Sequence, residues 1–483
     1  MKKSIKKHDL FKIIGIAILF TALLTWIIPV SQYTGTEMYV GEISRLGIAN
    51  LFASGVYSLS TMLYQVTFLL VLGGFYGLLS VTSGYKSLVE KIVDKLKGKE
   101  IPFILITSFI LAGLGSIISD LYVLLIFVPF LITIILNLKM DKITAICTTF
   151  GSILIGRIGA TFSPYAYNYI NSYFTMDFTS EIITKVAIFV LAYVLFNFFN
   201  LLHTKEVLKS KKKEVCEDKF ELMIEEKSTS KSKKNDKKVK SWPLVVVLLF
   251  VFVLVILGFV AWSTSFNITI FEDFHNWLLG LKIGDHAIFS YILGTEEIGI
   301  VKALGLWDLF NIQIILIIAS LIIALMYKVK FDDLIESFIT GAKKMSRLVI
   351  ILVMVYAVFI ITVWNPFVPT IVDWIMGLMK DFNIYLGSLA SFIASVFSVD
   401  LDFAAYSLGS YFASLADNQS ALMGIIMNAM HGFAGFFVPT SAILMMGLAY
   451  LNISYKEWMK YIWKFLVGML VGLLIIFTIV RYL

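Results

Sequence analysis

Long apolar segments separated by short polar stretches constrain this chain more than any other feature. Of its 483 residues, 59% are hydrophobic and 15% are charged, and the mean hydropathy is +0.87. Many of the apolar runs approach or exceed the ~20 residues that an α-helix needs to cross a bilayer. Because a backbone inside the bilayer must satisfy its own hydrogen bonds, such runs predict helices. The sequence therefore predicts an all-α polytopic membrane protein.

Lysine and arginine gather in a few stretches between the apolar segments. Because cytoplasmic loops carry an excess of positive charge, we expect the N-terminus and the basic linker 203–241 to lie in the cytoplasm. The charge pattern predicts about nine crossings and two hairpins, at 101–138 and 383–419. Each hairpin is either re-entrant or a pair of tightly packed helices. The net charge of +7 therefore reflects topology and does not indicate nucleic-acid binding.

Two segments place glycine and proline where a membrane helix should run unbroken. The predicted breaks are Gly156, Gly159 and Pro164 in the first segment, and Gly432, Gly435 and Pro439 in the second. Broken helices at bilayer depth are tolerated only where they are buried in protein or line a wet cavity. A matched pair of breaks in the two halves of a chain is typical of the binding site of a secondary transporter.

The two halves of the chain can be aligned. Asp120 aligns with Asp402, and Pro164 aligns with Pro439. We therefore expect colinear repeats at 47–202 and 330–483. The remaining segments are an N-terminal helix with an outer loop, the basic linker and a connecting unit with two helices: 1–46, 203–241 and 242–329.

The second repeat is expected to have the opposite orientation in the membrane. Helix 311–328 has no counterpart in the first half, so it adds one crossing. The charges agree, because the amphipathic stretch at 47–62 falls outside and the one at 331–346, before helix 348–365, falls inside. Inverted repeats with paired helix breaks are typical of transporters that work by alternating access.

Charged residues inside the apolar segments are candidates for the site. A carboxylate or guanidinium at the centre of a membrane helix costs at least ~2.5–3.5 kcal/mol, so it is retained mostly for function or pairing. Asp120, Asp400 and Asp402 lie at the predicted hairpin tips, and Arg157 lies at the first break. Arg157 would bind a substrate carboxylate as a bidentate fork, and the aspartates would bind amino or guanidino groups. The alternative is a salt bridge between Arg157 and an aspartate that holds two elements together.

Neutral polar residues near the breaks could add hydrogen bonds to a substrate or coordinate a coupling cation. They are Ser163, Asn168, Asn428, Thr440 and Ser441. Bonds between helices are an equally good explanation for any one of them. His431 could relay protons, although a structural role is the commoner one for such a histidine. No metal-ligand spacing and no phosphate-binding loop occurs, so the sequence predicts no cofactor and favours coupling to Na⁺ or H⁺ over ATP.

Several motifs along the chain resemble those of a known family. They are residues 24–29 (LTWIIP), 267–274 (NITIFEDF), 438–441 (VPTS) and 445–449 (MMGLA), followed by Trp458. In this order they resemble the YfcC-like family of the ion transporter superfamily, which includes arginine/ornithine antiporters and relatives of anaerobic C4-dicarboxylate carriers. The resemblance implies a scaffold domain and a transport domain that moves as an elevator. It also implies a homodimer.

The sequence therefore predicts a secondary active transporter of the plasma membrane that binds a small molecule and works by alternating access. The expected substrate is a basic amino acid, through arginine/ornithine exchange or cation-coupled uptake. The alternative is a C4-dicarboxylate or another small organic anion or amino acid, coupled to Na⁺ or H⁺. A channel or a sensor is a hypothesis of another class, but neither a repeated pore motif nor a soluble signalling domain is seen. An enzyme is disfavoured, because no nucleophile–base pattern occurs.

Overall fold

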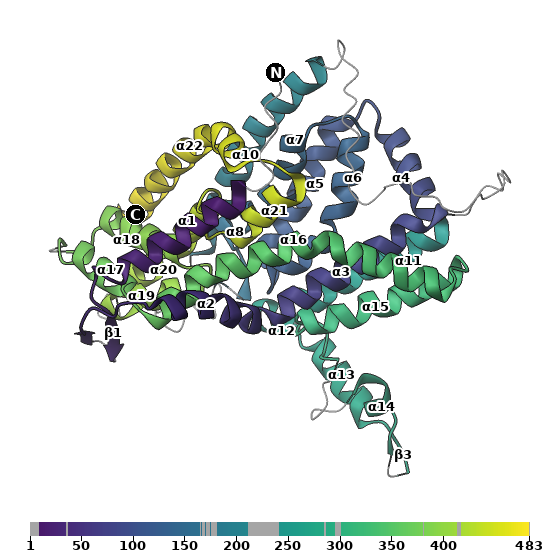
Figure 1. Ribbon diagram of the computed structural model, residues 1–483, viewed down its shortest axis with the longest axis horizontal. Coiled ribbons are helices and arrows are strands. Elements are labelled where there is room, and N and C mark those ends of the chain that lie inside the picture. Colours follow the sequence, from purple (N-terminus) through teal and green to yellow (C-terminus); the bar gives the residue numbers. More distant parts are fainter. Residues whose placement is uncertain are drawn as a thin grey trace.

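The computed structural model describes residues 9–482 except 35–36, 165, 167–169, 171–173, 175–180, 211–240, 285, 295–300, 380 and 413–416. Within these residues the chain is a bundle of helices (Figure 1) with two short antiparallel β-hairpins. The strands are β1 (Ser31–Thr34), β2 (Glu37–Val40), β3 (Lys282–Ile283) and β4 (His286–Ala287).

The first half of the chain, up to the basic linker, contains eleven described helical elements. They are α1 (Asp9–Leu24), α2 (Ile48–Thr61), α3 (Leu63–Val81), α4 (Ser83–Leu96), α5 (Glu100–Ile117), the 3₁₀ helix η1 (Leu121–Ile126), α6 (Val128–Asn137), α7 (Lys142–Ile146), the π-helical turn η2 (Cys147–Gly151), α8 (Ser152–Gly159) and α10 (Ile182–Ser210).

The second half begins after the linker. Its described helices are α11 (Trp242–Phe259), α12 (Trp262–Phe266), α13 (Ile270–Gly280), α14 (Ser290–Leu293), α15 (Leu309–Met326), α16 (Phe331–Trp364), α17 (Val368–Met376), α18 (Ile384–Phe397), α19 (Leu401–Phe412), α20 (Asp417–Ala434), α21 (Ala442–Leu451) and α22 (Tyr455–Tyr482). The α13–α14 segment with β3 and β4 projects from the body of the bundle (Figure 1).

Seven of the described helices are long and apolar enough to cross a membrane: α3, α5, α10, α11, α15, α16 and α22. This confirms the expectation of an all-α polytopic membrane protein. One expected boundary is wrong, because 331–346 and 348–365 form the single helix α16 of 34 residues. Its only glycine, Gly341, does not interrupt it, because this residue serves packing.

The most extensive contact between two described helices joins α3 to α16, and glycines lie at its centre. A Cβ on Gly341 would lie 2.0 Å from the Gly73 carbonyl oxygen, and one on Gly77 would lie 2.2 Å from the Ser337 carbonyl oxygen. Glycine at these positions therefore lets the two backbones touch, which is how membrane helices gain dispersion energy without a hydrophobic driving force. This contact makes α3 and α16 a closely packed pair.

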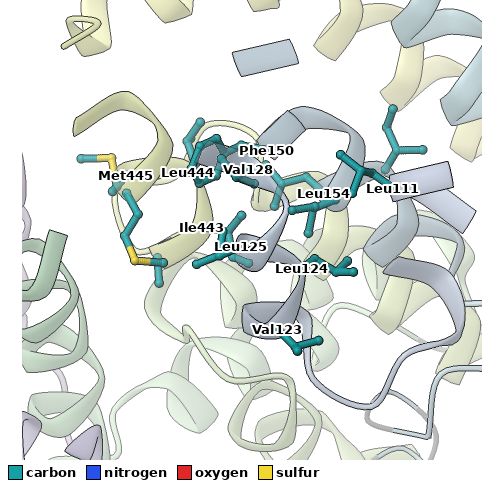
Figure 2. Packing of buried hydrophobic residues seen from close by; sticks show 14 of the residues in the cluster. Leu111, Val123, Leu124, Leu125, Val128, Phe150, Leu154, Ile443, Leu444 and Met445 are labelled. Atoms are coloured by element: carbon teal, nitrogen blue, oxygen red, sulfur yellow. The ribbon is translucent and has the colours of Figure 1, made fainter. Parts of the chain in front are cut away.

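Two helices are interrupted: the continuous run α7–η2–α8 ends at Gly159, and α20 ends at Ala434 before α21 begins at Ala442. Both interrupted helices lie in the core of the bundle. Phe150 of η2 and Leu154 of α8 pack in one buried cluster with Leu444 of α21 and Leu124 of η1, and Figure 2 shows these side chains together. A Cβ on Gly447 would lie 2.7 Å from the Phe150 ring, so α21 also approaches η2 closely. Burial in protein on all sides is what permits the helix ends in this region.

Candidate functional site

A cavity of about 290 Å³ lies where the two hairpin tips meet the two helix interruptions. Hairpin 1 consists of α5, η1 and α6, and hairpin 2 consists of α18 and α19. The polar side chains that line the cavity come from both tips, both interrupted helices and the α3–α16 pair: Gln65, Ser119, Asp120, Tyr122, Arg157, Tyr356, Ser395, Ser398, Asp400, His431, Thr440 and Ser441. The cavity therefore joins parts of the chain that are far apart in sequence.

The tip of hairpin 1 is held by its own polar side chains. The Asp120 carboxylate accepts a hydrogen bond from the Tyr122 backbone N–H at 2.8 Å and so caps η1. The Ser119 backbone N–H and hydroxyl both donate to the Phe259 carbonyl, at 3.0 and 3.1 Å. These bonds attach the tip to the end of α11 and fix the position of Asp120 at the cavity.

The tip of hairpin 2 uses similar chemistry. Asp400 Oδ1 accepts a hydrogen bond from the Asp402 backbone N–H at 3.2 Å, at the start of α19. The Ser398 hydroxyl donates to the Asp400 carbonyl and tightens the turn. Asp400 lines the cavity, whereas Asp402 does not.

Arg157, in the last turn of α8, links the two interrupted helices. Its Nη2 lies 2.5 Å from Nε2 of His431 in α20 and donates to the Val399 carbonyl of hairpin 2 at 3.4 Å. Because a guanidinium can only donate, His431 Nε2 must be the acceptor, which places the ring proton on Nδ1. His431 is thus a neutral partner that orients Arg157 without cancelling its charge.

The two interrupted helices cross at a glycine. A Cβ on Gly432 would lie 2.6 Å from Ile158 Cα and 2.7 Å from Ile158 N, so the two backbones touch. Next to this point, Asn428 Nδ2 donates to the carbonyls of Arg157 and Ile158, at 3.3 and 3.2 Å. The crossing places the Arg157 side chain at the cavity.

A hydroxyl in each interruption bonds to the first arm of a hairpin. Ser163 donates to the Ile118 carbonyl at 3.2 Å, and Thr440 donates to the Val396 carbonyl at 2.7 Å. Both bonds run from the segment after an interrupted helix to a backbone carbonyl near the end of a hairpin's first arm. They join each interruption to the hairpin that precedes it in sequence, so each hairpin and its interrupted helix are held together.

The structure places the predicted site residues in three groups. Those that line the cavity are Asp120, Arg157, Asp400, Thr440 and Ser441. Those that lie outside its lining are Ser163, Asp402 and Asn428. Asn168 falls outside the described residues. Sequence reasoning missed Gln65, Tyr122 and Tyr356, although a polar group in an apolar run is a signal that could have found each of them.

The residues predicted as helix breaks fall into two groups: some lie inside helices, and the others lie at helix ends or between helices. Gly156 and Gly432 lie inside helices, where they serve close packing; a Cβ on Gly156 would lie 2.4 Å from the Ala112 carbonyl oxygen. Gly159 is the last residue of α8, and the chain turns at Ala160, whose φ is +38°. Gly435 and Pro439 lie between α20 and α21, and Pro164 follows the first interruption.

Among the described residues that line the cavity, the groups with charge or partial charge are one guanidinium, two carboxylates and a helix N-terminus. Ser441, Ala442 and Ile443 at the start of α21 line the cavity, and the side chain of the N-cap, Ser441, makes no capping hydrogen bond. The first-turn N–H groups of α21 therefore offer partial positive charge to a ligand. Among the described residues, no group of three or more His, Cys, Asp or Glu side chains could hold a metal ion.

Comparison with known proteins gives the family. Two solved structures that resemble the chain are the Alcanivorax borkumensis YdaH transporter (12% identity, 99% of each chain covered, TM-score 0.42) and Neisseria gonorrhoeae MtrF, titled a member of a class of antimetabolite efflux pumps (12% identity, 99% of this chain and 95% of that chain covered, TM-score 0.34). No curated protein matches significantly.

The match of a family model is more extensive. The model of the DcuC family, the C4-dicarboxylate anaerobic carriers, matches residues 8–483. It does not support the narrower resemblance to the YfcC-like family or to arginine/ornithine antiporters. The chain therefore belongs to the C4-dicarboxylate anaerobic carrier family and is a membrane transporter.

Proposed function

We propose that this chain is a secondary active transporter that moves a C4-dicarboxylate or a closely related small organic dianion across the plasma membrane. One observation carries the proposal: Arg157 and the uncapped N-terminus of α21 line the same cavity. A dicarboxylate needs two positive partners. The guanidinium can bind one carboxylate as a fork, and the N–H groups of α21 can bind the other.

The size of the cavity suits a small substrate, and its two carboxylates bear on how an anion could be carried. At about 290 Å³ the cavity lies at the lower end of the range for ligand sites. Asp120 and Asp400 each accept a backbone N–H group of their own tip through Oδ1. Their charge opposes a dianion unless a cation accompanies it, which supports coupling to Na⁺ or H⁺.

We further propose two inverted repeats, 47–202 and 330–483, that move as an elevator. The lengths of the two interrupted helices support the repeats. The run α7–η2–α8 covers 142–159 and α20 covers 417–434, so the two helices are equally long, and an interruption follows each of them. The hairpins and interrupted helices would form the transport domain, and the α3–α16 pair would belong to the scaffold. The cytoplasmic linker 203–241, the connecting unit 242–329, the N-terminal segment 1–46 and a homodimer complete the proposal.

The test is uptake by purified protein in proteoliposomes. Labelled succinate and labelled arginine are offered separately, each with a Na⁺ gradient, a proton gradient or none. We expect succinate uptake that depends on one of the two gradients. Arg157→Gln should reduce it to the level of empty liposomes, and Arg157→Lys should reduce it about tenfold or more, because an ammonium cannot form the fork. Arginine uptake without succinate uptake would refute the proposal.

Two neighbouring carboxylates provide a matched comparison for the coupling ion. Asp400 lines the cavity and Asp402 does not. Asp400→Asn is therefore expected to change the dependence of succinate uptake on the driving cation, whereas Asp402→Asn keeps it. Equal effects of the two substitutions would contradict a coupling role for Asp400.

A further inference from the structure

A second cavity, of about 340 Å³, has no lining residue in common with the first in the part of the chain that the structure describes. Its walls are α3, α4, hairpin 1 and α11, and its lining is almost entirely apolar and aromatic. Representative side chains from these walls are Phe75, Leu79, Leu111, Phe130, Leu248 and Phe252. The cavity therefore separates the hairpin that carries Asp120 from helices that pack around it.

This cavity opens sideways towards the surroundings of the protein. Leu79 on its floor is 0% exposed, whereas Ile110 and Leu249 on its rim are 43% and 58% exposed. The rim residues belong to α5 and α11, two of the helices that are long and apolar enough to cross a bilayer. The opening therefore faces lipid hydrocarbon.

Among the described residues, three polar side chains line this cavity: Tyr76, Tyr85 and Thr107. The two tyrosine hydroxyls have partners within the protein. Tyr76 donates its hydroxyl to the Ile126 carbonyl at 2.6 Å, and Tyr85 hydrogen-bonds to Thr133. A water needs two to four polar partners, and with the tyrosines occupied Thr107 is the remaining polar side chain of this lining, so the cavity favours apolar ligands. Leaving it empty would forfeit the dispersion contacts of its lining. Hydrocarbon is the occupant that fits this lining.

Positive charge lies at one end of the cavity. Lys91 of α4 directly precedes Ile92, which lines the cavity, and its Nζ donates to the Ser241 hydroxyl at 2.8 Å. Ser241 is the N-cap of α11 and stands one turn before Val245, which also lines the cavity. An ammonium group and a helix N-terminus at this position are complementary to a phosphate.

We propose that this cavity binds one acyl chain of an anionic bilayer phospholipid, whose phosphate lies beside Lys91 and the N-terminus of α11. The acyl chain fills the space between hairpin 1 and α3, α4 and α11. Binding of this lipid is independent of the transported substrate, so its test does not depend on the proposed function.

The test is native mass spectrometry of the purified full-length protein after incubation with palmitoyl-oleoyl phosphatidylglycerol or palmitoyl-oleoyl phosphatidylethanolamine. Val245→Trp places an indole in the cavity. Val246→Trp is the matched control, because Val246 is 54% exposed and does not line the cavity. We expect the most strongly retained phosphatidylglycerol to fall about fivefold or more in occupancy with Val245→Trp and to be unchanged with Val246→Trp.

A second pair of tryptophan variants keeps the test valid if Val245→Trp does not fold. Ile110→Trp blocks the rim from α5, and Ile106→Trp, one turn away and outside the lining, is its control. Lys91→Gln should lower the ratio of bound phosphatidylglycerol to phosphatidylethanolamine about threefold, whereas Lys97→Gln, whose exposed ammonium pairs with Asp94, leaves it unchanged. Equal lipid retention in both members of each tryptophan pair, or bound detergent without phospholipid in the wild type, would overturn the proposal.

Discussion

Gly432→Ala tests the crossing of the two interrupted helices. The added Cβ would lie 2.6 Å from Ile158 Cα, whereas ordinary van der Waals contact begins at 3.4 Å. The obstacle is backbone, which cannot rotate aside as a side chain can. Helices α8 and α20 must therefore separate by about 0.8 Å, or one of them must bend.

The energetic consequence follows from the neighbouring bonds. Asn428 Nδ2 lies 3.3 and 3.2 Å from the carbonyl oxygens of Arg157 and Ile158. A separation of about 0.8 Å takes both beyond hydrogen-bonding distance. Overpacking costs about 1–3 kcal/mol and each of the two lost bonds about 1 kcal/mol, so we expect a loss of about 3–5 kcal/mol in the free energy of unfolding.

Function should respond more strongly than stability, because Arg157 moves with α8. A displacement near 1 Å can lower the rate of a positioned reaction by about two orders of magnitude, so we expect uptake to fall about tenfold or more. Thermal unfolding in detergent and uptake in proteoliposomes measure the two effects. Gly113→Ala is the control, since nothing lies within 4 Å of its added Cβ. Wild-type Tm and uptake in Gly432→Ala would refute the reasoning.

Three further predictions concern stability. Burial raises the pKa of Asp141, but its hydrogen bond with His203, the charge of that histidine and the bonds from Thr144 hold the pKa below its ordinary value. The stabilisation by this carboxylate is therefore complete above about pH 4 and is lost as the pH falls through the lowered pKa. When Tm is measured from pH 7 to pH 3, it should fall less in Asp141→Asn than in the wild-type protein. Trp458 is fully buried and donates to the Phe436 carbonyl at 2.7 Å, so Trp458→Phe should cost about 2 kcal/mol or more in chemical unfolding, whereas Trp463→Phe, at an exposed site, should cost little. Thr440→Val removes the bond to hairpin 2 and should speed hydrogen exchange there, while exchange in hairpin 1 stays constant; equal exchange in both would contradict this.

Sequence reasoning located the elements of the site better than its side chains. The hairpin tips and the two interruptions were found from embedded acids and from glycine and proline, and Arg157 lies at the cavity. Asp400 and Asp402 could not be separated in this way. They are two residues apart at the start of a helix, where 3.6 residues complete a turn, so their side chains point in widely different directions. Only the orientation of α19 shows which one lines the cavity.

The sequence pattern also gives the wrong role for two glycines, and the reason is again tertiary packing. Gly156 and Gly432 lie inside helices, although the sequence pattern predicts a break at each. A glycine weakens a helix locally, yet it also admits another backbone, and sequence alone does not show which effect operates. The neighbour that decides, Ile158 for Gly432, comes from a different interrupted helix.

The sequence by itself determined the class of the protein: apolar length dictates helices in a bilayer, and the clustering of lysine predicts the orientation of the chain. It did not determine the substrate, because the same embedded arginine and aspartates suit a basic amino acid or a dianion. The tertiary structure decided which charges share a cavity. It brought Arg157, His431 and the N-terminus of α21 together and turned Asp402 away. Such contacts depend on how helices far apart in sequence rotate and pack, which local periodicity does not specify.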